Sequence, residues 1–199
     1  MFDARLRPLI DPPLDRAGQA MASWGLRADA VTLIGLGLGL VSAATIALGA
    51  PGWALIPLLA SRLMDGLDGA VARATRLSDF GGYLDIWSDF VFYGAVPFAF
   101  ALLDPANARP AAFLLMAFYV NGTSFLGFAS IAAKRGLETS RQGRKSLYYS
   151  SGLLEGAETI AFFVLICAVP AAFPVAAWTF GALCLLTATA RVLNARAIF

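Results

Sequence analysis

Long apolar segments, separated by short polar or proline-containing breaks, dominate the chain. They fall at about residues 30–50, 53–74, 81–103, 110–133, 150–169 and 172–191. Each segment is close to the ~20 residues that an α-helix needs to cross the hydrocarbon core of a bilayer. The pattern therefore predicts an all-α integral membrane protein, with six transmembrane helices forming one domain over residues 29–199.

Residues 1–28 differ from the rest because they mix acids, bases and prolines. The apolar residues Leu6, Leu9, Ile10 and Leu14 can lie on the membrane surface, and we expect the prolines to prevent one continuous helix. No central apolar run is present, so this stretch does not have the pattern of a cleavable signal peptide. We expect an interfacial segment.

The composition agrees with a membrane protein. Hydrophobic residues make up 59% of the 199 residues and charged residues only 14%, whereas soluble domains carry about 25% charged residues. The net charge of +2, without a basic run interleaved with aromatics, does not favour nucleic acid as a partner. Cys167 and Cys184 lie in apolar runs and are expected to pack in the core, and Gly35 and Gly39 predict close helix packing.

The positive charges are distributed unevenly over the connections. All but one of the 15 Lys and Arg residues fall on one side of the membrane if both termini, the 62–79 connection and the 134–145 connection lie there. The exception is Arg109. Since cytoplasmic loops carry an excess of Lys and Arg, both termini are expected in the cytoplasm.

Four aspartates stand out at the cytoplasmic ends of the second and third predicted spans. Asp65 and Asp68 are three residues apart, and Asp85 and Asp89 are four apart, so each pair shares one face of its helix. The two helices are consecutive and antiparallel, which allows the pairs to face each other. Gly69, Ala72 and Gly81 continue these faces with small residues, past which a ligand can approach the backbone.

Four converging carboxylates repel one another unless cations lie between them. The chain has no histidine, and carboxylate oxygens favour Mg²⁺ or Mn²⁺. Arg73 adds a donor suited to phosphate, so the residues indicate a metal-dependent diphosphate site. The ordinary alternative is a polar connection whose aspartates pair with Arg62, Arg73 and Arg76.

The stretches DGLDGAVAR (residues 65–73) and GGYLDIWSD (residues 81–89) are similar to the signature of the CDP-alcohol phosphatidyltransferase family. That pattern is D-x-x-D-G-x-x-A-R, a spacer usually of eight residues, and G-x-x-x-D-x-x-x-D. All fixed positions match, and the spacer ATRLSDF has seven residues. The connection between two helices can absorb this difference.

The resemblance implies transfer of a substituted phosphate group from a CDP-alcohol, usually CDP-diacylglycerol, to an alcohol hydroxyl, with release of CMP in phospholipid biosynthesis. It implies two Mg²⁺ or Mn²⁺ ions, a homodimer and a bacterial inner-membrane location with a cytoplasmic active site. The metal ligands would be Asp65, Asp68, Asp85 and Asp89, and Asp89 would also be the catalytic base. The CDP moiety would be bound by Asp68, Gly69, Ala72, Arg73 and Gly81.

The acceptor alcohol is not specified by the signature. Arg144 and Lys145 are candidates to bind a phosphate on it, and Glu155 and Glu158 are candidates to line the cavity, because acids within a span need polar surroundings. Two other readings stay open at this point. An aromatic prenyltransferase also uses aspartate pairs and Mg²⁺, and a cation transporter would hold its acids nearer the bilayer midplane.

Overall fold

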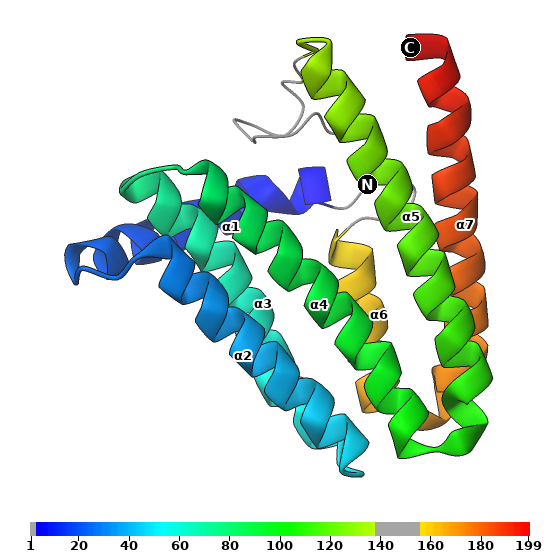
Figure 1. Ribbon diagram of the computed structural model, residues 1–199. Coiled ribbons are helices and arrows are strands. Elements are labelled where there is room, and N and C mark those ends of the chain that lie inside the picture. Colours follow the sequence, from blue (N-terminus) through cyan, green and yellow to red (C-terminus); the bar gives the residue numbers. More distant parts are fainter. Residues whose placement is uncertain (1–2, 138–155) are drawn as a thin grey trace.

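The chain folds into a bundle of helices (Figure 1), and the computed structural model describes residues 3–137 and 156–199. The helices are α1 (Asp3–Ser23), α2 (Ala28–Ala47), α3 (Pro51–Ala74), α4 (Asp79–Leu103), α5 (Ala108–Lys134), α6 (Gly156–Ala168) and α7 (Phe173–Ile198). Short 3₁₀ turns, η1 (Pro105–Asn107) and η2 (Pro170–Ala172), precede α5 and α7. The described residues contain no strand, which confirms the predicted all-α class.

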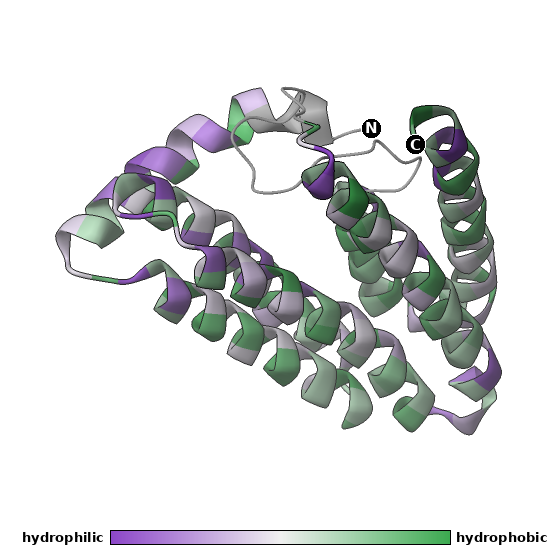
Figure 2. Ribbon diagram, turned by 45° about the horizontal axis from the view of Figure 1, so that its top comes forward, coloured by the Kyte–Doolittle hydropathy of each residue, from purple (hydrophilic) through white to green (hydrophobic). Residues whose placement is uncertain are grey.

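Four of these helices are long and apolar enough to cross a membrane: α2, α4, α5 with η1, and α7 with η2. Helix α3 is also long, but it carries Arg62, Asp65 and Asp68 within its apolar run. The described part of α6 spans 13 residues. Figure 2 shows apolar residues along the helices, with polar residues gathered in α1 and near helix ends. Over the described residues, the six predicted apolar runs thus coincide with helices, and four of these helices have the length and composition of a span.

Helix α1 corrects the prediction that prolines interrupt the N-terminal segment. It is one helix over Asp3–Ser23 that contains Pro8, Pro12 and Pro13. A proline removes one backbone donor, and the carbonyl that loses its partner must then find another. Because Pro8 and Leu9 are exposed, the carbonyls opposite Pro12 and Pro13 can bond to water, so the helix continues.

Helix α1 lies across the end of the bundle and packs on α3 (Figure 1). Leu14 and Met21 pack against a small buried cluster of Val31, Leu67 and Val71. At Gly18 the two backbones come so close that an added Cβ would lie 2.6 Å from the Ala70 Cβ. The apolar face of α1 therefore covers α3 where the aspartate motif lies.

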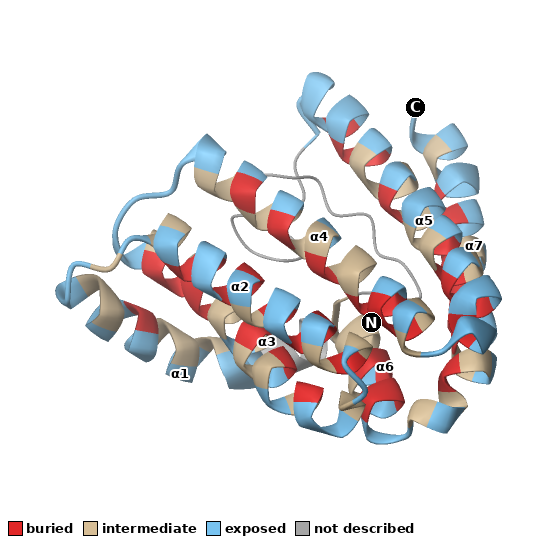
Figure 3. Ribbon diagram, turned by 60° about the horizontal axis from the view of Figure 1, so that its bottom comes forward, coloured by how far each residue is buried: buried red, intermediate tan, exposed pale blue. Residues whose placement is uncertain are grey.

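Helix α2 packs against both α3 and α4, and the three helices turn their buried residues inward (Figure 3). An added Cβ at Gly35 would lie 3.1 Å from the Met64 Cβ, and one at Gly39 would lie 2.7 Å from the Phe92 ring. These contacts confirm that the two glycines serve close helix packing. Cys167 and Cys184 are buried, as predicted, and both are free thiols.

The link between α3 and α4 consists of residues 75–78 only. The Ser78 side chain caps α4 by accepting a hydrogen bond of 3.0 Å from the Gly81 backbone N–H, an arrangement that satisfies an otherwise free donor. Three of the seven spacer residues, Ala74, Asp79 and Phe80, belong to the two helices, so the link itself is only four residues long. This short link still lets Asp65 of α3 approach Asp85 and Asp89 of α4.

Candidate active site

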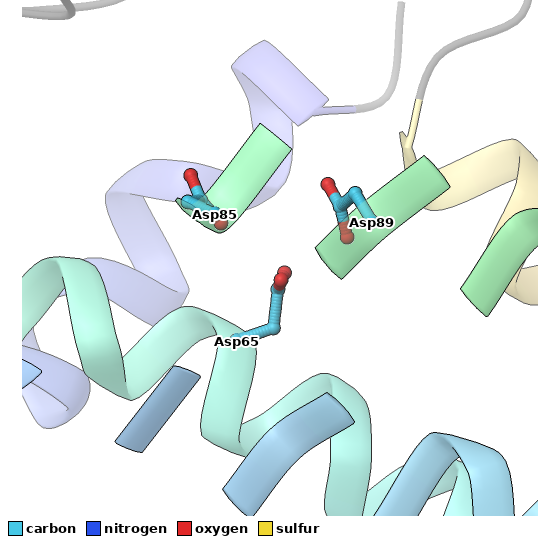
Figure 4. A group of neighbouring side chains, drawn as sticks. All are labelled: Asp65, Asp85 and Asp89. Carbon is cyan, nitrogen blue, oxygen red and sulfur yellow. The ribbon is translucent and has the colours of Figure 1, made fainter. Parts of the chain in front are cut away.

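Three carboxylates converge between α3 and α4. Asp65 comes from α3, and Asp85 and Asp89 come from successive turns of α4 (Figure 4). One oxygen of each lies within 4.8 Å of the others. We call Asp65, Asp85 and Asp89 the carboxylate triad. Only oxygen donors are present in this group, and such a donor set fits a hard divalent cation such as Mg²⁺ or Mn²⁺.

Asp68 lies one turn after Asp65 on α3 and is not a member of the triad. Asp68 is only 6% exposed. The Thr32 hydroxyl of α2 donates a hydrogen bond of 2.6 Å to Asp68 Oδ2. A buried carboxylate is costly unless it is hydrogen-bonded or paired. Thr32 therefore supports Asp68 from the neighbouring helix.

Arg62 lies one turn before Asp65 and contacts the triad directly. Its Nη1 is 2.7 Å from Asp89 Oδ1 and 3.5 Å from Asp65 Oδ1. The ordinary alternative from the sequence, in which the aspartates pair with nearby arginines, thus describes Arg62 correctly. This pairing and a cation site involve the same carboxylates, Asp65 and Asp89, and each carboxylate has a second oxygen that a cation can use.

The small residues of the motif are partly accessible. Gly69, Ala72 and Gly81 are all half-buried. An added Cβ at Gly69 would lie 3.3 Å from Arg73 Nη1, and one at Gly81 would lie 3.0 Å from Ser78 Oγ and 3.4 Å from Asp29 Oδ1. Side chains therefore already stand close to both glycine positions, and a Cβ at either would narrow the space further.

Arg73, which the sequence assigns to the diphosphate, pairs with α1. Its Nε and Nη2 donate to Asp15 Oδ1 at 3.2 and 2.7 Å. Both side chains are about half exposed, at 51% and 45%, so the pair can separate at little cost. Arg73, the last residue of the motif, is therefore held by an exposed ion pair with α1.

The acceptor residues are located only in part. Arg144, Lys145 and Glu155 lie outside the described residues. Glu158 lies in the first turn of α6, a helix that packs against α3, and it is half-buried. It is not a member of the carboxylate triad.

Thr32 and Asp15 contact motif residues, and Asp29 lies near the position of a Cβ added at Gly81, but none of the three was identified from the sequence. Thr32 and Asp29 share the first turns of α2, and Asp15 lies on α1. Their spacing relative to the motif contains no signal, because each contact depends on how a separate helix packs. Arg62 was identifiable, since it precedes Asp65 by one helical turn within an apolar run.

Comparison with known proteins places this site in a family. The family profile described as CDP-alcohol phosphatidyltransferase matches residues 25–190. The chain is 46% identical over 193 residues to the inner membrane protein YnjF of Escherichia coli K12, covering 96% of this chain and 94% of that protein. It is 36% identical over 100 residues to the archaetidylinositol phosphate synthase of Pyrococcus horikoshii, covering 50% and 53% of the two chains.

A solved structure shares the fold. It is the Mycobacterium tuberculosis phosphatidylinositol phosphate synthase PgsA1 with CDP-DAG bound, which superposes with a TM-score of 0.71 at 20% identity over 92% of each chain. The profile match covers most of the chain and includes both halves of the aspartate motif. The chain belongs to the CDP-alcohol phosphatidyltransferase family of membrane enzymes.

Proposed function

We propose that this enzyme transfers a substituted phosphate group from a CDP-alcohol, in particular CDP-diacylglycerol, to an alcohol hydroxyl and releases CMP. The observation that carries the proposal is the convergence of Asp65, Asp85 and Asp89 oxygens within 4.8 Å, in a chain that has the family motif. In this reaction the acceptor oxygen forms a bond to the phosphorus that bears the alcohol. The bond from that phosphorus to the CMP oxygen breaks.

Each motif residue has a proposed task. Asp89 accepts the proton of the acceptor hydroxyl, and Asp65, Asp68, Asp85 and Asp89 hold two Mg²⁺ or Mn²⁺ ions. Bound divalent ions neutralise diphosphate charge and stabilise a leaving phosphate. Gly69, Ala72 and Gly81 leave room for the cytidine moiety, and Arg73 exchanges Asp15 for a diphosphate oxygen. This exchange is supported by the exposure of the Arg73–Asp15 pair.

A phosphorylated alcohol is the acceptor class that we favour. Two of the similar proteins are named as synthases of inositol phosphate lipids, and Arg144 and Lys145 are suited to a phosphate. We also propose a homodimer in the bacterial inner membrane, with six spans and a cytoplasmic active site. The inner-membrane location is supported by the name of the relative YnjF. No observation favours a prenyltransferase or a transporter.

The proposal is tested by CMP release from purified protein supplied with CDP-diacylglycerol. The acceptor panel consists of glycerol 3-phosphate, serine, inositol, inositol phosphate and phosphatidylglycerol. We expect CMP release with one acceptor, its loss on addition of a chelator, and its recovery with Mg²⁺ or Mn²⁺. Asp89→Asn should lower kcat at least about 100-fold, the usual effect of losing a general base.

Asp104→Asn is the matched control because it removes the same charge at the opposite end of α4. Asp104 accepts a hydrogen bond of 2.8 Å from the Ala106 N–H, and an asparagine oxygen can accept the same bond. Its kcat should stay within about twofold of wild type. Absence of turnover with every acceptor, or full activity in Asp89→Asn, would contradict the proposed function.

A further inference from the structure

We propose that Arg62 is a positioning residue that orients Asp89 and acts as a fixed positive charge opposing cation binding at the carboxylate triad. The inference rests on the proposed function for its catalytic part. Its electrostatic part concerns only the triad and a divalent cation. The two parts can therefore be tested separately.

The position of the guanidinium is set from several sides. Nη1 donates to Asp89 Oδ1 at 2.7 Å, and Nη2 donates to Ser61 Oγ at 3.1 Å. The Ser61 hydroxyl in turn donates to the Gly35 carbonyl at 2.7 Å. The guanidinium carbon lies 4.0 Å from the centre of the Phe92 ring. Arg62 therefore connects Asp89 to the packed interface of α2, α3 and α4.

The burial of Arg62 argues that it is more than a packing residue. Its side chain is 7% exposed, and its Nε is buried with no hydrogen-bond partner among the described residues. Removing a charge from water is costly, and replacing a buried ion pair by apolar residues is often neutral or stabilising. Stability alone does not account for an arginine here, whereas a task at the triad does.

The geometry predicts how Arg62 acts on Asp89. The arginine holds Asp89 through Oδ1, and because Phe92 and Ser61 fix the guanidinium, the direction of the second oxygen, Oδ2, is fixed too. Such an orientation is what a group needs to meet an acceptor hydroxyl in productive geometry. Loosening the pair should reduce turnover more than substrate binding.

The same contact also predicts that Arg62 weakens the binding of a cation at the triad. The Arg62 charge lies 2.7 Å from one triad oxygen and 3.5 Å from another, and it repels any cation bound between them. Neutralising Arg62 should therefore strengthen cation binding, although one side-chain contact of Asp89 is lost. At distances of several ångström in a partly buried site, we expect tighter binding of about tenfold.

The experiment compares wild type with Arg62→Gln, Arg62→Lys and the control Arg76→Gln. Arg76 lies in the exposed link between α3 and α4, so its variant removes the same charge without touching the triad. Mn²⁺ affinity is measured by titration without any nucleotide, and kcat and KM for CDP-diacylglycerol come from CMP release. Thermal unfolding of each variant shows whether it is folded.

For Arg62→Gln we expect Mn²⁺ to bind about tenfold more tightly and kcat to fall about tenfold or more, with KM changed less than about threefold. Arg76→Gln should leave the Mn²⁺ affinity, kcat and KM within about twofold of wild type. Unchanged or weaker Mn²⁺ binding in folded Arg62→Gln would overturn the proposal, as would an equal effect in Arg76→Gln.

If Arg62→Gln does not fold, Arg62→Lys carries the test. Lysine keeps the charge but cannot form the planar contacts with Asp89, Ser61 and the Phe92 ring. We therefore expect Mn²⁺ affinity within about twofold of wild type and kcat about tenfold lower. Wild-type kcat, or a larger change in Mn²⁺ affinity, would overturn the proposal. If wild type releases no CMP, the proposed function fails, while the Mn²⁺ titrations still decide the electrostatic role.

Discussion

At the residue scale, the carboxylates of the motif differ in their surroundings. Asp65, Asp85 and Asp89 form the triad, whereas Asp68 is buried and bonded to Thr32. Asp89 is already paired with Arg62. Four residues of one type in one motif therefore stand in three different environments, and removing the partner of each should have a different effect.

Thr32→Val tests the support of Asp68. Valine has nearly the shape of threonine but no hydroxyl, so Asp68 loses the hydrogen bond from α2 while remaining buried. The free energy of unfolding should fall by about 1–3 kcal/mol. The kcat/KM for the CDP-alcohol should fall about tenfold, because Asp68 is then free to leave the orientation that CDP binding needs.

Thermal unfolding and CMP release measure the two effects. Thr45→Val on the same helix is the control, since the Thr45 hydroxyl donates to the Val41 carbonyl within α2. It should change kcat/KM less than about twofold. Wild-type kcat/KM in Thr32→Val would show that Asp68 needs no support from α2.

At the element scale, α1 is the helix for which the prediction from the sequence was wrong. The three prolines predicted a broken segment, because proline within a helix removes backbone hydrogen bonds. In the structure, packing of Leu14 and Met21 on the cluster beneath α1, together with the close approach at Gly18, holds one helix along α3. These tertiary contacts outweigh the tendency of proline to interrupt a helix. They join residues far apart in the chain, so a short stretch of sequence does not reveal them.

Gly18→Leu tests whether α1 is held by this close approach. An added Cβ would lie 2.6 Å from the Ala70 Cβ and 2.7 Å from the Ala70 carbonyl carbon, so the helices must separate. Overpacking of this kind costs about 1–3 kcal/mol. Backbone amides of α1 should then exchange with deuterium about tenfold faster or more, measured by hydrogen exchange with mass spectrometry.

Gly37→Leu is the matched control on α2, since nothing lies within 4 Å of a Cβ added there. Exchange in α1 should be the same as in wild type. If Gly18→Leu also leaves exchange in α1 unchanged, the close approach does not hold the helix, and the Asp15–Arg73 pair must be positioned in another way.

At the scale of the whole molecule, the arrangement of charges makes a prediction about the membrane. The link between α3 and α4 and the turn between α4 and α5 lie at opposite ends of α4. The first carries Arg76, and the second is followed by Arg109. The excess of Lys and Arg on the side of the first predicts that this link faces the cytoplasm.

Single cysteines can test this orientation without changing any charge. Leu77 is 61% exposed and Ala108 is also exposed, so Leu77→Cys and Ala108→Cys should both be reactive. The native Cys167 and Cys184 are buried and should contribute little background. A membrane-impermeant maleimide should label Leu77→Cys in inside-out vesicles and Ala108→Cys in right-side-out vesicles. The reverse pattern would place the active site outside the cytoplasm.

The sequence by itself determined the class of the fold, the helices α2 to α7 and the convergence of Asp65 with Asp85 and Asp89. Hydrophobic periodicity and helical spacing are local properties, so runs of apolar residues predicted α2 to α7 and the spacing of Asp85 and Asp89 predicted one shared face. The motif also identified the family, which the profile match confirmed. These inferences need only the geometry of one helix or of two consecutive helices.

The tertiary structure decided which side chains surround the aspartates. Thr32, Arg62 and Asp15 come from α2, α3 and α1, and they reach Asp68, Asp89 and Arg73 through helix packing. The partner of Asp89 in this packing is Arg62, which lies 27 residues earlier in the chain. Contacts between separate helices depend on crossing angles and on small residues such as Gly18 and Gly39. No local pattern encodes the contacts of Thr32 and Asp15. The sequence offers Arg62 as one of three candidate partners for the aspartates, and only the folded chain assigns it to Asp89.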